Sequence, residues 1–216
     1  MRRRLMMARN REDKPKANEI WYYAPEKVTL YTETDVVNHT FSNGKGVVTT
    51  QGTILRNWFY DIDTITELKI AEDTYTSIGG SALYRMAGIQ ELILPDSIIS
   101  IGSFVIRSDS SLLKVKFPAK LETLGTYNLY QCPNIIEVSD IPATMTDISN
   151  HTFVTGKYPY LIFRGLIPPT LGGAAIFTWN NTAPLYVPAE AVDAYKEATY
   201  WSYFKARIQA IPDNLL

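Results

Sequence analysis

The chain has 216 residues, of which 46% are hydrophobic and 20% charged, and a net charge of −1, values that are ordinary for a folded globular protein. A single cysteine, Cys132, excludes an intrachain disulfide framework, and we expect this thiol to pack as a small apolar side chain. No apolar run approaches the roughly 18 residues that a transmembrane helix needs, so we expect no membrane span.

Charge is divided unevenly along the chain, because residues 1–16 form a basic arm. Seven Lys and Arg residues against two acidic ones give this segment +5, which leaves −6 for the remainder. A block of like charge is compatible with a solvated tail, a protein-docking arm or a nucleic-acid-binding arm. No aromatic residues interleave the arginines, so docking to another protein is favoured and nucleic acid is an unlikely partner. The expected anchoring residues, within an arm spanning 1–17, are Arg2, Arg3, Arg4, Leu5, Met6, Met7, Arg9 and Arg11.

Residues 18–62 are expected to form a β-rich cap. The segments 19–23, 28–31 and 46–50 are rich in β-branched and aromatic residues and predict strands. The run 42–46, Ser-Asn-Gly-Lys-Gly, has the composition of a hairpin turn. Such a cap would cover the unpaired strand edge at the open end of a repeat array.

About ninety residues in the middle of the chain repeat every 23 or 24 positions in four copies, within a solenoid that we expect over residues 63–176. One apolar column lies at spacings of 24, 23 and 23, and a second at spacings of 23, 23 and 24. The columns are Leu68, Leu92, Val115 and Val138, and Ile78, Ile101, Leu124 and Ile148. A repeat of this length cannot bury its own apolar face and must stack on its neighbours, which predicts a solenoid of leucine-rich-repeat type.

Each repeat is expected to contain a strand, a turn and a partly helical stretch. Alternating apolar residues place the strand around the first column, and Pro95, Pro118 or Pro142 ends it. Glycines follow the second column at 79, 102 and 125, where we expect a sharp turn that uses positive φ. The last stretch of each repeat should end in a core residue, such as Phe104 or Tyr130.

The repeats resemble a known family. Ile89 to Phe104 matches most of the pattern L-x-x-[LIV]-x-[LI]-P-x-x-[LIV]-x-x-I-G-x-x-A-F of the BspA-like leucine-rich repeats, which occur on bacterial surfaces and in phages. Cys132 falls on the cysteine position of that pattern, and the run 184–196 resembles the closing segment of the family. The resemblance covers roughly residues 63–212 and implies an α/β-type, mostly β repeat solenoid.

The C-terminal cap is expected over residues 177–216. Pro188 to Tyr195 predicts a short helix, because proline suits the first turn and the apolar positions lie on one face. Trp201, Tyr203 and Phe204 are expected to seal this end of the solenoid.

Catalytic chemistry is not expected. The two histidines, His39 and His151, have no second histidine or cysteine at metal-ligand spacing, and Asp61 and Asp63 have no general-acid partner. The sequence has no phosphate-binding glycine loop and no nucleophile motif, so we predict a protein without enzymatic activity, metal or cofactor.

Binding is therefore the predicted function. A solenoid displays a long regular surface, and aromatic residues outside the apolar columns are natural contact points for protein or carbohydrate. The candidates are Tyr75, Tyr84, Tyr127, Tyr158, Tyr160 and Trp179.

Three settings are compatible with such a binding protein. The first is a phage virion component, because the basic arm lacks the apolar run of a secretory signal and a virion protein needs none. In this setting the arm docks to another virion subunit and the solenoid is displayed to a host-surface protein or glycan. The alternatives are a bacterial cell-surface adhesin and a cytoplasmic interaction scaffold; a homo-oligomer is also possible.

Overall fold

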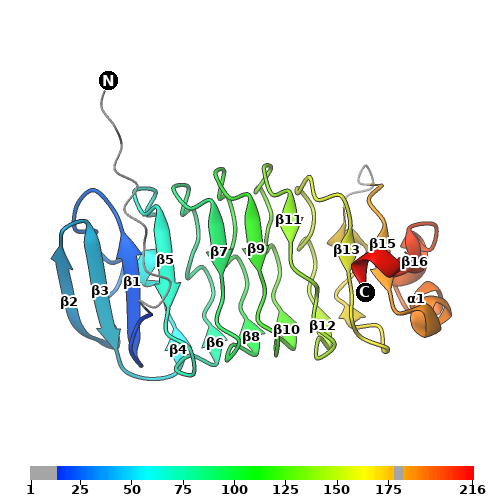
Figure 1. Ribbon diagram of the computed structural model, residues 1–216, viewed down its shortest axis with the longest axis horizontal. Helices are drawn as coiled ribbons and strands as arrows, with labels where there is room; N and C mark the ends of the chain where they lie inside the picture. The colour runs from blue at the N-terminus through cyan, green and yellow to red at the C-terminus, as the bar shows by residue number, and fades with distance from the viewer. Residues whose placement is uncertain (1–13, 178–181) are drawn as a thin grey trace.

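The computed structural model describes residues 14–177 and 182–216. These residues form an elongated stack of short strands, with an antiparallel sheet at one end and the helix α1 (Val192–Glu197) at the other (Figure 1). The predicted anchoring residues Arg2 to Arg11 and the candidate Trp179 lie outside the described residues. The predicted mostly β repeat solenoid with capped ends is confirmed.

The N-terminal cap is a four-stranded sheet in the order β2-β3-β1-β5. Its strands are β1 (Glu19–Tyr23), β2 (Val36–Ser42), β3 (Lys45–Thr50) and β5 (Glu67–Ile70). The hairpin between β2 and β3 turns at Asn43 and Gly44, whose φ angles of 52° and 78° are those of a type I′ turn.

The strand predicted at 28–31 is wrong. Val28 and Leu30 are buried, but the segment has no strand partner, and the Tyr31 N–H instead bonds the Trp58 carbonyl at 2.9 Å. The alternation of apolar residues therefore predicted burial correctly, but it does not correspond to hydrogen bonding with a neighbouring strand. The edge strand β2 was missed, because four of its seven residues are exposed, none is fully buried, and its apolar pattern is weak.

Each repeat contributes two strands, one more than predicted. The first column builds the parallel strands β7 (Glu91–Ile93), β9 (Lys114–Lys116) and β11 (Glu137–Val138). The second column builds a parallel sheet of six two-residue strands in the order β14-β12-β10-β8-β6-β4. These are β4 (Ile54–Leu55), β6 (Ser77–Ile78), β8 (Ser100–Ile101), β10 (Thr123–Leu124), β12 (Asp147–Ile148) and β14 (Thr170–Leu171). The segments predicted as partly helical are successive turns within the repeats from β6 to β12.

The regular spacing of the glycines has a different cause from the one expected. Neither Gly102 nor Gly125 has a positive φ, so the prediction of positive φ there is wrong. A Cβ on Gly125 would lie 2.5 Å from the carbonyl carbon of Gly102, because successive coils stack backbone on backbone at this column. The glycines are required by close approach between coils.

The C-terminal cap joins a parallel sheet to short helices. Strands β13 (Leu161–Ile162), β15 (Leu185–Val187) and β16 (Ile208–Ala210) form the sheet. The predicted helix is confirmed as the 3-10 turn η3 (Ala189–Ala191) followed by α1, and η4 (Trp201–Phe204) follows it. Trp201 and Phe204 are buried against Phe177, whereas Tyr203 is exposed and does not seal the end as expected. The remaining 3-10 turns are η1 (Asn57–Phe59), η2 (Ala174–Ile176) and η5 (Asp213–Leu215).

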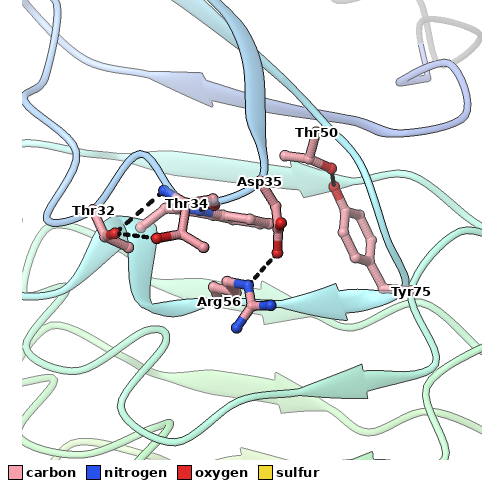
Figure 2. A network of polar contacts seen from close by, with 7 residues as sticks. Thr32, Thr34, Asp35, Thr50, Arg56 and Tyr75 are labelled. Atoms are coloured by element: carbon pink, nitrogen blue, oxygen red, sulfur yellow. Dashed lines mark hydrogen bonds and ion pairs between the residues drawn. The ribbon is translucent and has the colours of Figure 1, made fainter.

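Polar contacts fasten the N-terminal cap to the first coils of the solenoid (Figure 2). Asp35 pairs with Arg56, and the hydroxyls of Thr50 and Tyr75 lie 2.6 Å apart. Tyr75 is completely buried, since it packs on Trp58 and its hydroxyl is satisfied by Thr50. Its prediction as a surface-binding residue is therefore wrong, and it belongs to the core.

Candidate functional site: a row of aromatic side chains

A row of aromatic rings, bridged at one point by an arginine, crosses the turns that connect the two strand columns. Its members are Tyr31, Tyr60, Tyr84, Phe104, Arg107, Tyr127, Tyr130 and His151, which we call the aromatic row. Tyr31 is exposed and the others are half-buried, so the row forms surface along its whole length.

Ring contacts hold the row in register from coil to coil. Tyr60 stacks on Tyr84 with ring centroids 4.9 Å apart. Tyr127 lies between Phe104, at 5.3 Å, and His151, at 4.5 Å, with both pairs of rings nearly parallel. These side chains order one another before any ligand arrives, which reduces the entropy that binding would cost.

The backbone beneath the row is unusual. Ser81, Phe104, Tyr127 and His151 occupy the same repeat position and have φ between 59° and 62°. In this left-handed conformation each residue donates its backbone N–H to the coil that follows, as in the 2.9 Å bond from Phe104 to the Thr126 carbonyl and the 3.0 Å bond from Tyr127 to the Asn150 carbonyl. Non-glycine residues adopt this conformation at a cost of about 1 kcal/mol, so the inter-coil hydrogen bonds and ring stacking offset strain at each step.

A buried amide supports the centre of the row. Asn128 is fully buried, and its Oδ1 accepts hydrogen bonds from the backbone N–H groups of Val105 and Ile106 at 3.0 and 3.2 Å. Its Nδ2 donates to the carbonyls of Gly102 and Gly125 at 2.9 and 2.8 Å. One side chain therefore satisfies four backbone groups in the turns that carry Phe104 and Tyr127.

The guanidinium of Arg107 lies in the middle of the aromatic row. Its Cζ is 5.2 Å from the ring centroid of Tyr130, 5.4 Å from those of Phe104 and Tyr127, and 6.0 Å from that of Tyr84. Distances of this size permit cation–π attraction to all four rings. The rings thus fix one positive charge within the row.

The column at the family's cysteine position lies in the core beneath these turns. It contains Met86, Asp109 and Cys132 at spacings of 23 residues, and all three are buried. Burial raises the pKa of the Asp109 carboxyl to about 8, although the backbone N–H of Met86 opposes the shift. Burial, with the nearby Asp109 carboxyl as a second cause, raises the pKa of the Cys132 thiol to about 12. This thiol is buried as predicted and stays protonated at neutral pH, so it is a poor nucleophile.

The tyrosines predicted from the sequence as binding residues lie in three different environments. Tyr84 and Tyr127 both lie in the aromatic row. Tyr158 is buried and donates its hydroxyl to the Phe153 carbonyl, so its assignment to the binding surface is corrected, as for Tyr75. Tyr160 is half-buried beside Tyr186 in the C-terminal part, away from the row.

Six members of the row were not among the sequence candidates, and two of them, Tyr31 and Tyr60, belong to the region expected as the N-terminal cap. Phe104 and Tyr130 were expected in the core, yet both are half-exposed. Arg107 was not singled out because it extends no apolar column, and His151 was considered only as a metal ligand. The repeat spacing would have identified the residues on the coils. Phe104, Tyr127 and His151 are separated by 23 and 24 residues, and Tyr84, Arg107 and Tyr130 by 23 and 23.

A groove of about 770 Å³ lies elsewhere, where β5 and β7 belong to different sheets. Its lining includes Lys14, Glu67, Glu72 and Glu91, with no nucleophile beside a base. Among the described residues, no three His, Cys, Asp or Glu side chains gather as a metal site would require. The described helices are also too short or too polar to cross a membrane. The aromatic row therefore remains the candidate functional site.

The parallel stack of 23-residue coils, capped at both ends, defines a leucine-rich-repeat solenoid. Residues 37–158 match the BspA type leucine-rich repeat region, in six copies. This match covers more than half of the 216 residues, so the chain belongs to the BspA-type leucine-rich repeat family. No curated protein matches the chain.

Proposed function

We propose that this chain is a non-enzymatic binding protein that recognises a protein partner through the aromatic row. The proposal rests on one observation: seven rings and one guanidinium are held in register across successive coils while remaining accessible. Tyrosine and arginine are the residues that most often dominate protein–protein binding energy, because they combine large contact area with few rotatable bonds. Membership of a repeat family whose domains are typically non-enzymatic binding modules supports the same conclusion.

The biological setting we propose is a phage virion. The basic arm, with +5 over residues 1–16, would dock to another virion subunit, while the rest of the chain, with −6, is displayed outward. The opposite charges of the two parts support this division, since a basic arm on an acidic body favours an acidic docking surface on a different protein.

Co-sedimentation with purified particles of a candidate phage tests the setting. Full-length protein is expected to sediment with the particles, whereas a variant lacking residues 1–16 is expected to remain in the supernatant. If both forms stay in the supernatant, the virion setting fails and the bacterial cell-surface adhesin becomes the proposal to pursue.

Alanine substitution tests the recognition surface separately. A Tyr84→Ala/Tyr130→Ala variant is expected to lose partner binding by at least tenfold, since two central contact residues are removed. The matched control is Ile93→Ala/Lys116→Ala, which shortens two exposed side chains on the strand face. Equal losses in the two variants would exclude the aromatic row as the recognition surface.

A further inference from the structure

Arg107 differs from three of the other four arginines that the structure describes. The fourth, Arg207, also has no carboxylate within 4.0 Å among the described residues, but its Nε donates to the Ala183 carbonyl at 2.8 Å. Arg56, Arg85 and Arg164 each pair with an aspartate 21 to 24 residues earlier in the chain, namely Asp35, Asp61 and Asp140. The residue 23 positions before Arg107 is Tyr84, and the residue 23 positions after it is Tyr130. The preceding coil therefore supplies no carboxylate to Arg107. Aromatic rings lie one repeat before and one repeat after this arginine instead.

The guanidinium consequently has unused hydrogen-bonding capacity. Its Nε is buried and has no hydrogen-bond acceptor among the described residues. No carboxylate in the described part of the chain lies within 4.0 Å of its nitrogens. Faces of aromatic rings attract a cation but accept hydrogen bonds poorly, so the surrounding rings fix the position of Arg107 without satisfying its donors.

Nearby acids do not neutralise this charge. Asp61 is already paired with Arg85 at 3.3 Å. Asp109 follows two residues after Arg107 but is buried within the core, and its own environment favours the protonated form. The described surface around the row therefore carries one uncompensated positive charge, on a body whose net charge outside the arm is negative.

We infer that Arg107 is the anchor for a carboxylate of the protein partner, in the form of an aspartate or glutamate side chain that enters the aromatic row. This inference rests on the proposed function and names the chemistry that the row selects. A guanidinium binds a carboxylate through two parallel N–H···O bonds, and a charge-assisted bond of this kind is stronger where neighbouring rings exclude water. Rings that flank Arg107 would contact the apolar residues on either side of the acidic one.

A protein carboxylate is favoured over an acidic sugar by the arrangement of the rings. Sugars stack on free ring faces, but the faces of Phe104, Tyr127 and His151 are turned toward one another in the nearly parallel stack. The row therefore offers ring edges and tyrosine hydroxyls, which suit side chains and backbone of a peptide.

Nuclear magnetic resonance of the full chain provides a direct test through the Nε–H signal of Arg107. The probes are the capped peptides Gly-Phe-Glu-Phe-Gly and Gly-Phe-Gln-Phe-Gly, which differ only in the charge of the central residue. The glutamate peptide is expected to shift the Arg107 signal and to bind at least tenfold more tightly than the glutamine peptide. Arg107→Lys keeps the charge but lacks the planar fork, and is expected to lose most of this preference.

Arg85→Gln is the matched control. Arg85 is exposed, already pairs with Asp61, and occupies the repeat position next to that of Arg107. It is expected to leave the preference for glutamate unchanged. Binding of both peptides to the row with equal affinity would overturn the role of Arg107 while leaving the proposed function intact. If neither peptide shifts any signal of the row, both the role of Arg107 and the proposed function are contradicted. If trigalacturonate binds more tightly than the glutamate peptide, Arg107 recognises the carboxylate of a sugar and not of a protein, and the inference is overturned.

Discussion

The aromatic row and the outer face of β7, β9 and β11 follow the same repeat period but have opposite chemistry. On the strand face, Glu91, Lys114 and Glu137 lie side by side in the parallel register, and Lys114 pairs with Glu137 at 2.7 Å while both side chains remain exposed. In the aromatic row, the rings are half-buried and stacked on one another. A solenoid repeats its backbone on every side, so the two faces differ in the side chains that they present and not in their backbone.

The two faces should also differ in what a substitution costs. Exposed charges on a strand exchange contacts with water at little cost, whereas packed rings and the groups beneath them have no alternative partner. Substitutions at four positions examine this difference, beginning at the support of the aromatic row and ending on the strand face.

The largest effect is expected for Asn128→Ala. Removing the amide breaks four hydrogen bonds to backbone groups in the core, each worth about 1 kcal/mol or more, so we expect a loss of about 4 kcal/mol in the free energy of unfolding. Urea denaturation followed by circular dichroism measures it. Asn134→Ala is the control, because Asn134 is exposed and its side chain makes a single backbone contact, at 2.9 Å. Similar losses in both variants would show that Asn128 has no special supporting role.

The sequence predicted the parts of the fold that depend on periodicity. The columns of Leu92 and Ile101 fixed the coil length and the core, because burial of alternate residues leaves a direct pattern in sequence. It did not predict the left-handed turns at Phe104 and Tyr127, since their φ values are imposed by hydrogen bonds to the next coil and not by residue type. Glycine at 125 was read as a turn residue because close approach of two backbones has no local signature.

The candidate site was predicted only in part for a related reason. Tyr84 and Tyr127 were identified as aromatic residues outside the apolar columns, but so were Tyr75 and Tyr158, which the structure buries. Whether a tyrosine fills a gap between coils or lies at the surface depends on packing with residues far apart in sequence, such as the contact of Tyr75 with Thr50.

The next effect concerns the buried carboxyl of Asp109, with its pKa of about 8 in the folded protein against about 3.8 for an ordinary aspartate. Between these values the unfolded chain is ionised while the folded protein keeps the proton, so wild-type stability falls as the pH rises, by at most about 1.4 kcal/mol per pH unit. Above pH 8 both states are ionised and the loss is complete. Asp109→Asn cannot ionise and should be about 2 kcal/mol more stable than the wild type at pH 7, after allowance for its added N–H donors.

Denaturation of both proteins between pH 4 and 9 measures this effect. The advantage of the variant should grow with pH up to about 8 and then stay constant. Subtracting the two curves removes the contributions of all other ionisable groups, which the proteins share. A difference that does not change with pH would show that the folded protein holds Asp109 ionised.

A smaller effect distinguishes ring packing from backbone strain at Tyr127. Both Tyr127→Ala and Tyr127→Gly remove the ring that contacts Phe104, Tyr130 and His151, and should cost about 2 kcal/mol. Glycine adopts a φ of 59° without strain, whereas alanine does not, so the glycine variant is expected to be the more stable by about 1 kcal/mol. Thermal denaturation of the two variants compares them directly. The reverse order, which is usual elsewhere in proteins, would mean that the turn relaxes to negative φ once the ring is removed.

The smallest effect is expected on the strand face, for Lys114→Ala. The hydrogen bond to Glu137 raises the pKa of Lys114, but both side chains are exposed and salt screens their attraction. We therefore expect no measurable change in the urea midpoint at physiological salt, and the same peptide binding as in the wild type. The informative comparison is with Tyr127→Ala under identical conditions. If Lys114→Ala were the more destabilising of the two, charge pairing between coils would be a major source of solenoid stability, and the strand face could no longer be regarded as the passive side of the molecule.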